Sequence, residues 1–398
     1  MPTKLDVQPT VGDPLELRSR VGARIQRQRA LLNLTAQSLA KQLGLSRNTI
    51  SNYETGRTEP TAHDLVRLTE VLGCTLADLL GSEDEAPPPR FAFRAHAPLR
   101  RDPQIAVAAR KYLRAYTEIE DITNSRLPGR LRSFPWDGER PLSDRDIESA
   151  ADTLRQSSGL HDTGPENIAA VLESLGVRTL FFEHDGKGLD GLSTVQGDMC
   201  LVMLRDRRRV VERTIFSAAH ELGHLVLHPH LFTPEEREAE ADAKRYEAEA
   251  DKFAGNFLVP SDELVRVWKE ERLHRHSLFN ALILLKRVFH VSFHCLYHRV
   301  IELKLHHRVE PARFIQQIKR QLGIVGPARM EDLEPDPLRP EVLYRTTRFS
   351  RLVRSAFLQE LIGVSKVAEM FQVPVDRAKE ITTDWLRPKH ELVADSDL

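Results

Sequence analysis

Apolar residues recur at helical spacing through the first 80 residues, and short polar turns separate the repeats. The pattern predicts five short helices between residues 17 and 80, of which the last four occupy 36–43, 47–54, 62–72 and 76–80. Thr35 and Ser46 stand where side-chain caps are needed, and Gly44 makes a tight turn between two helices. The inward faces predict a core formed by Leu39, Ala40, Leu43, Leu45, Ile50, Leu65, Leu68 and Leu72.

The rest of the chain predicts helices around one small sheet. Apolar runs at 176–182 and 199–204 predict strands, with an irregular turn at 186–193 between them. Helices are expected at 103–124, 146–156, 165–175, 262–273, 277–289 and 292–305 and, with a helix-turn-helix-like pattern, within 349–386. The predicted fold class is mainly α with a small β-sheet.

At 398 residues the chain is long enough for two or three domains. We predict an N-terminal five-helix domain at 1–80 and, because the next segment starts acidic and proline-rich, a linker at 81–102. A central α+β domain is expected at 103–305, and a helical C-terminal region at 306–398.

The most informative stretch is an almost wholly apolar helix at 214–230, which carries His220, Glu221 and His224. Residues four apart lie on one helix face, roughly 5–6 Å from each other, so both imidazoles can meet one zinc ion. Glu221 is close to such a metal but poorly placed to bind it, which suits a base acting on water. Chance can also place two structural histidines at this spacing, but polar side chains in a buried helix need partners.

A third ligand is expected on a second helix, which ends near Pro260. Its apolar face includes Ala250, and Glu247 and Asp251 lie on the same side. We expect Glu247 as the third ligand and Asp251 as the group that accepts the other ring N–H of His220.

Several neighbouring polar residues receive other roles. A capping box at the start of the second helix is predicted from Thr233, Pro234 and Glu236. A solvated face suits Glu238, Glu240 and Glu249. His228 is expected to cap the helix or to support a ligand, whereas His230 does not fit a metzincin pattern because Leu227 replaces the required glycine. Tyr246 and His228 are candidates for stabilising an oxyanion.

The motifs at 213–228, 247–254 and 258–260 resemble those of the ImmA/IrrE family of zinc metallopeptidases, which share H-E-x-x-H and E-x-x-x-D with the wider gluzincins. The resemblance covers about residues 145–305. It implies zinc (Zn2+) as cofactor and a gluzincin-like domain that cleaves peptide bonds with Glu221 as base. It also implies that the substrate is a helix-turn-helix repressor, either a separate protein or this chain's own N-terminal domain.

Residues 18–80 resemble the Xre/Cro-type helix-turn-helix domains, with the run 50–56 and Pro60 matching well. Ala36 departs from that family, which often has glutamine there, so one phosphate or base contact is expected to be weaker. From Arg18 to Arg57 the chain has eight basic residues and one acidic residue, a local charge of +7 suited to phosphates. Contacts with double-stranded DNA are expected from Arg47, Asn48, Ser51, Asn52 and Arg57. A protein-interaction domain with a solvated basic face is the alternative.

The composition of the chain limits the kinds of partner and the cellular location that we expect. The net charge of −1 gives no global basic field, so any nucleic-acid binding must use the local patch. The three cysteines are far apart and form no C-x-x-C pair, which argues against disulfides and a cysteine zinc site. No signal segment and no apolar run of about 18 residues occurs. We therefore expect a soluble cytoplasmic protein with no membrane partner; a homodimer stays open.

Together these features predict a zinc metallo-endopeptidase that binds DNA and regulates transcription; the resemblance to the ImmA/IrrE family further implies that it does so through repressor cleavage in a stress or mobile-element response. The alternative is a non-proteolytic DNA-binding regulator whose zinc domain senses metal or a partner. The intact Glu221 disfavours it, since a structural zinc site does not need that carboxylate. A second metal site is not expected from the histidine stripe at His290, His294 and His298, because residues 291–292 interrupt the helix.

Overall fold

The computed structural model describes residues 14–32, 34–81, 90–91, 103–131, 141–160, 167–182, 190–205, 211–232, 240–307, 310–327, 333–338 and 347–387. Most of the predicted linker and the predicted capping box at 233–236 lie outside these residues. The chain forms two compact units: Met1–Pro88 with Pro98–Arg114, and Pro89–Ala97 with Ala115–Leu398.

The first unit contains a bundle of five helices, of which the last four have the predicted boundaries and the first begins at Pro14, before the expected start at residue 17. They are α1 (Pro14–Leu31), α2 (Ala36–Leu43), α3 (Arg47–Glu54), α4 (Ala62–Leu72) and α5 (Leu76–Leu80). The hydroxyl groups of Thr35 and Ser46 accept backbone N–H bonds at the starts of α2 and α3, and Gly44 ends α2 with φ +64°. Helix α1 lies so close to α3 that a Cβ on Gly22 would stand 2.3 Å from the carbonyl oxygen of Tyr53.

The second unit contains one four-stranded sheet. Its strands are β1 (Arg90–Phe91), β2 (Val177–Phe182), β3 (Gly191–Gln196) and β4 (Met199–Arg205). They lie in the order β1-β3-β4-β2; β2 pairs with β4 in parallel, and the other two pairs are antiparallel.

The predicted irregular turn at 186–193 is wrong for residues 191–193, which begin β3. Gly191 suggested a turn, but a Cβ there would stand 2.8 Å from Cγ of Glu221. The glycine therefore serves a close approach between a strand and a helix rather than a turn. Thr194 and Val195, both β-branched, continue the strand.

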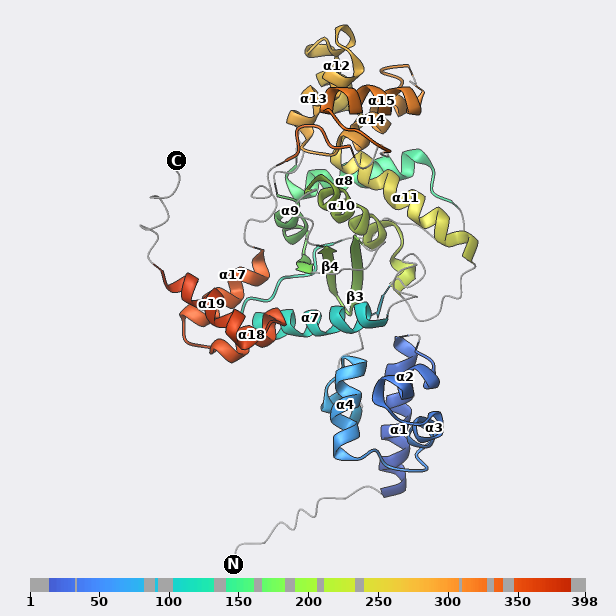
Figure 1. Cartoon of the computed structure of the whole chain (residues 1–398), viewed down its shortest axis with the longest axis vertical. Helices are drawn as coiled ribbons and strands as arrows, with labels where there is room; N and C mark the ends of the chain where they lie inside the picture. The colour runs from blue at the N-terminus through green and yellow to red at the C-terminus, as the bar shows by residue number, and fades with distance from the viewer. Residues whose placement is uncertain are drawn as a thin grey trace, which may run out of the picture. The chain divides into compact units, whose positions relative to one another are not determined.

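Helices pack on this sheet and extend well beyond it (Figure 1). Helix α7 (Pro103–Ile122) begins in the first unit and ends in the second. The others are α8 (Asp144–Ser158), α9 (Ile168–Ser174), α10 (Val211–Leu227), α11 (Glu240–Leu258), α12 (Ser261–Glu270), α13 (Leu278–Phe289), α14 (Phe293–Glu302), α15 (Pro311–Leu322), α17 (Arg348–Leu358), α18 (Val364–Phe371) and α19 (Val375–Leu386), with 3-10 turns η1 (Pro229–Phe232) and η2 (Leu273–Arg275). The prediction of a mainly α fold with a small sheet is confirmed.

The C-terminal helices attach to the sheet through buried charges. Arg178 on β2 pairs with Glu120 on α7 at 2.7 Å, and both side chains are fully buried. Arg348 at the start of α17 reaches the same carboxylate at 2.6 Å. Removing one member of such a buried network leaves an uncompensated charge, so these residues fix α17 against β2 and α7.

Among the described residues, no single helix has the length and apolarity needed to cross a membrane. The consecutive helices α13 and α14 meet these criteria only as a pair, bent by 108°. Most of their apolar residues belong to the buried core of the second unit or pack against it.

Candidate functional site

Helices α10 and α11 bring the candidate ligands together because small residues let their backbones approach. A Cβ on Gly223 would stand 3.3 Å from Cα of Ala250 and 3.1 Å from the Phe253 ring. Glu247 lies one turn before Ala250 on α11 and therefore faces the histidine-bearing side of α10.

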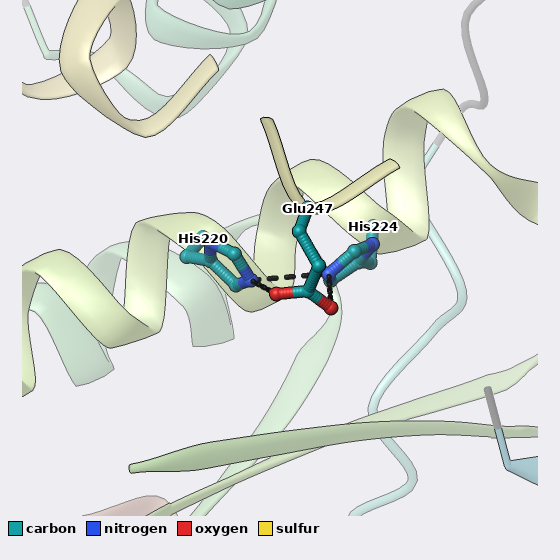
Figure 2. A group of neighbouring side chains, drawn as sticks. All are labelled: His220, His224 and Glu247. Carbon is teal, nitrogen blue, oxygen red and sulfur yellow. Dashed lines mark hydrogen bonds and ion pairs between the residues drawn. The ribbon is translucent and has the colours of Figure 1, made fainter. Parts of the chain in front are cut away.

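Three ligand atoms converge at this crossing (Figure 2). The Nε2 atoms of His220 and His224 are 3.1 Å apart. The carboxylate of Glu247 lies 3.4 Å from the first and 3.6 Å from the second. The donor atoms all lie within 4.8 Å of one another, and no other group of three or more such residues occurs in the described part of the chain. His224 is fully buried, while Glu247 is 38% exposed and so faces solvent in part.

The outer nitrogen of His220 has a partner. Nδ1 of His220 lies 2.8 Å from Oδ1 of Asp251, so a carboxylate accepts its N–H and leaves Nε2 as the nitrogen that faces the cluster. Burial lowers the pKa of His220, but bonds with Asp251 and Glu247 and the charge of Glu221 raise it to about 10. The sequence suggested that Asp251 lies on a buried face, but its side chain is 60% exposed.

His224 is supported by a fully buried chain of side chains. Its Nδ1 lies 3.1 Å from Nδ1 of His228, and Nε2 of His228 lies 2.9 Å from Oε2 of Glu249. Burial lowers the pKa of His228 well below its usual value, so this ring is neutral. While Glu249 is ionised it accepts the Nε2–H of His228, whose Nδ1 then accepts from His224. The lone pair on Nε2 of His224 is thereby also directed at the cluster.

The donor set fits a divalent cation. Two imidazole nitrogens 3.1 Å apart beside a carboxylate can share one positive charge, which is the proton of His220 when no metal is bound and a divalent cation when one replaces that proton. Two histidines and one glutamate are also the protein ligands of a familiar class of catalytic zinc sites, which keep one position open.

Glu221 lies beside this cluster and is held by β3. Its Oε2 accepts a 2.7 Å hydrogen bond from the hydroxyl group of Ser193, and the side chain is almost fully buried. The backbone of Gly191 lines the other side of the carboxylate. These two contacts fix the orientation of the carboxylate. Glu221 is not one of the three residues whose ligand atoms converge.

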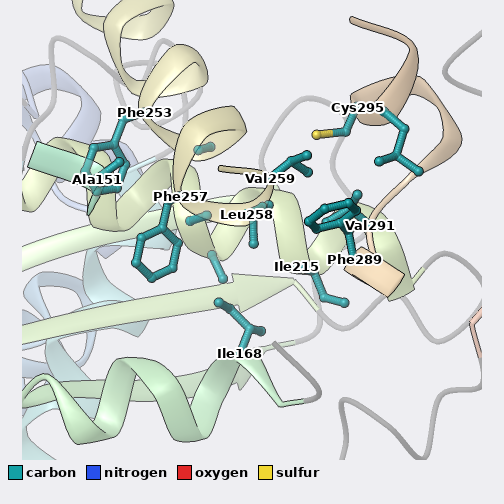
Figure 3. Close-up of a cluster of buried hydrophobic side chains, with 14 of the residues drawn as sticks. Ala151, Ile168, Ile215, Phe253, Phe257, Leu258, Val259, Phe289, Val291 and Cys295 are labelled. Carbon is teal, nitrogen blue, oxygen red and sulfur yellow. The ribbon is translucent and has the colours of Figure 1, made fainter. Parts of the chain in front are cut away.

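An apolar core holds α10 and α11 in register (Figure 3). Phe253 and Phe257 stack with ring centroids 5.8 Å apart. They belong to a large buried cluster to which Ile215 of α10 and Phe289 of α13 also contribute. Because interiors are close-packed, the distance between the two helices is set by this core rather than by the polar residues above it.

Glu249 was predicted on a solvated face, and this is wrong: it is only 6% exposed. Glu249 precedes Phe253 by four residues, and Phe253 precedes Phe257 by four residues. Glu249 therefore lies on the buried helix face one turn before Phe253, and this spacing could have predicted its burial. Ser193 gave no comparable signal. His228 and Tyr246, the oxyanion candidates, are both buried, so neither faces solvent beside the ligand pair.

The second histidine pair lies on α14. The Nε2 atoms of His294 and His298 are 2.9 Å apart, whereas His290 caps α13 with φ +52°. No third candidate ligand joins this pair among the residues that the structure describes.

The helix-turn-helix surface presents most of the expected residues. Exposed side chains on or next to α3 are those of Arg47, Asn48, Ser51 and Arg57, and Asn52 is half-buried. Arg29 pairs with Glu54, the one acid already included in the +7 count, at 2.5 Å, and Arg18 pairs with Glu59, which lies outside the counted range. The positive charge that remains for an external anion is therefore smaller than the sequence count.

Two family models match the chain. A helix-turn-helix model matches residues 25–79, and the peptidase M78 model, described as an IrrE N-terminal-like domain, matches residues 172–300. The second range contains the strands β2 to β4 and all of the candidate ligands.

Curated relatives resemble part of the chain. The HTH-type transcriptional regulator DicA of Escherichia coli is 41% identical over 70 residues, which are 17% of this chain and 52% of that protein. An uncharacterized HTH-type transcriptional regulator of Methanocaldococcus jannaschii is 39% identical over 57 residues, 14% of this chain and 86% of that one. The chain thus spans about half the length of the first of these relatives.

A solved structure, a Mycobacterium tuberculosis transcriptional regulator, is 20% identical with a TM-score of 0.30. It covers 46% of this chain, and the match covers 51% of the solved chain.

Proposed function

The chain belongs to the helix-turn-helix family through residues 25–79 and carries an IrrE N-terminal-like domain at residues 172–300, and from this pairing we propose that it is a DNA-binding zinc metallopeptidase. The observation that carries the proposal is the convergence of His220, His224 and Glu247 beside a carboxylate that is not a ligand. Its substrate would be a helix-turn-helix repressor, and cleavage would switch on genes of a stress or mobile-element response.

The chain's own residues have distinct tasks in this mechanism. His220, His224 and Glu247 would hold the zinc ion, with Asp251 and His228 fixing the two rings. When bound there, zinc supplies Lewis-acid chemistry that activates water and polarises a carbonyl group. Glu221 takes the proton of the attacking water on its carboxylate and passes it to the leaving amine. Ser193 keeps that carboxylate aimed at the site throughout.

The first unit would direct this activity to DNA. Arg47, Asn48 and Ser51 on α3 have the side chains that read base edges, and nearby arginines suit phosphates. A cytoplasmic location of the protein fits this proposed binding to DNA. The competing proposal, a regulator whose zinc domain only senses metal or a partner, leaves the Ser193–Glu221 hydrogen bond without a task.

The decisive variant is Glu221→Gln, which keeps the side-chain size and all three proposed ligands. Cleavage should fall by about 10² to 10⁴ because the proton of the attacking water loses its acceptor. Reporter induction in cells, with a blot for fragments of repressors encoded nearby, measures this. Glu271→Gln makes the same change at an exposed helix end and should behave as wild type. Normal induction without fragments in every strain would leave only the sensor proposal.

A further inference from the structure

The outermost strand of the sheet comes from a distant part of the chain. The backbone of β1 pairs antiparallel with β3, with Arg90 opposite Val195 and Phe91 opposite Thr194. β1 begins ten residues after the end of α5, in the segment that leads from the helix-turn-helix helices to the peptidase-like domain. Without β1, the described residues would leave β3 as the edge of the sheet.

That edge belongs to the strand beside the candidate site. Ser193, which holds Glu221, directly precedes Thr194, the partner of Phe91. Gly191 on the same strand lines the Glu221 carboxylate. β1 also contacts η1, the turn that directly follows the histidine-bearing helix α10. A chain lying along the edge of β3 is therefore next to the reactive groups.

An exposed strand edge presents unpaired N–H and C=O groups that accept another extended chain. A protease substrate must be extended to present its peptide bond, so this edge suits it, and β1 already occupies part of it. We propose that Arg90–Phe91 is a built-in competitor that pairs with β3 and restricts the access of an extended peptide substrate. The proposal rests on the proposed peptidase function and adds the regulation of its site.

The covalent connection makes so short a strand effective. A tethered segment acts at an effective concentration on the order of millimolar, although two residues pair weakly by themselves. A peptide in trans must exceed that concentration or pair over more residues to displace β1. Substrates with long extended segments are therefore favoured over short ones.

The test uses two full-chain variants that extend the run Pro87–Pro89 to five prolines. Arg90→Pro/Phe91→Pro extends it into β1, and Glu85→Pro/Ala86→Pro extends it by the same length away from β1. Adjacent strand residues direct their N–H groups to opposite edges, so the first variant removes whichever N–H points at β3. The second variant is the matched control.

Two measurements need no catalysis. Hydrogen exchange of the β3 amide that faces β1, that of Thr194 or Val195, should speed up by about 10-fold in Arg90→Pro/Phe91→Pro and stay unchanged in the control. A fluorescent peptide with the sequence of residues 87–94 should bind the first variant about 10-fold more tightly than it binds wild type or the control. Equal exchange and equal affinity in all three proteins, or the same change in both variants, would overturn the proposal.

Cleavage provides a separate result. If a repressor is cut, the first variant should lower KM for it and leave kcat unchanged, as expected for loss of a competitor. If exchange and peptide affinity change as stated but no protein is cut, the strand competitor stands and only the peptidase function fails.

Discussion

Each histidine of the candidate metal centre is held at its outer nitrogen by a different environment. His220 is held by Asp251, which solvent reaches, whereas His224 is held by His228 and Glu249, which are buried. A hydrogen bond to Nδ1 fixes both the ring and the tautomer, and so determines whether Nε2 can donate a lone pair. The buried chain therefore controls the tautomer of His224 through Nδ1, the ring nitrogen that does not face the other candidate ligands.

Glu249→Gln tests this control. The amide can donate to Nε2 of His228, which moves the proton of His228 to Nδ1 and that of His224 to its ligand nitrogen. Zinc affinity should fall by about 10- to 100-fold, the usual cost of losing such a partner. Competition with a chromophoric chelator measures it. Glu271→Gln serves as the control, and an affinity equal to that of wild type would show that the chain through His228 does not set the tautomer.

The candidate ligands could be predicted from the sequence because the position of each depends on the period of its own helix. The spacing of His220 and His224, and the position of Glu247 on the alanine-bearing face, follow from the helical period and so predict their meeting. Glu249 and Ser193 contact the site across elements, and their contacts depend on how α10 packs against α11 and β3. No local pattern encodes that packing.

Among the elements, those with local start and stop signals were predicted best. Helices α2 to α5 have the expected bounds because caps such as Thr35 and Ser46 fix them from within. Strand β3 was missed in part because Gly191 imitates a turn. Strand β1 has only two residues, and its pairing depends on a partner more than a hundred positions later in the chain.

Helix α3 is the element through which we expect DNA to be read. Asn48→Ala or Arg47→Ala in the full chain should each cost about 1–3 kcal/mol of binding free energy if the residue contacts a base. Gel shifts across the protein's own promoter at low salt provide the measurement. Arg377→Ala, a similar loss of an exposed arginine on α19, is the control. Absence of any retardation by the wild-type protein would count against DNA binding by this unit.

At the scale of the whole molecule, the first unit extends beyond the helix-turn-helix core. Arg110 on α7 donates to the carbonyl oxygen of Leu72 and to the side chain of Gln28, and Val107 packs against Gly73. A fragment that ends at residue 80 lacks this cover, so binding studies on the isolated unit need residues to Arg114. The candidate metal centre lies wholly within the second unit.

The most direct test of the account is the zinc content of the purified full chain, measured by elemental analysis beside His224→Ala. Wild type should hold about one zinc ion per chain because two histidines and a glutamate complete the protein part of the site. The variant should hold almost none, since the ligand it loses is the most deeply buried one. Full stoichiometric zinc in His224→Ala, or no zinc in wild type loaded with excess zinc, would show that His220, His224 and Glu247 do not form the proposed zinc site.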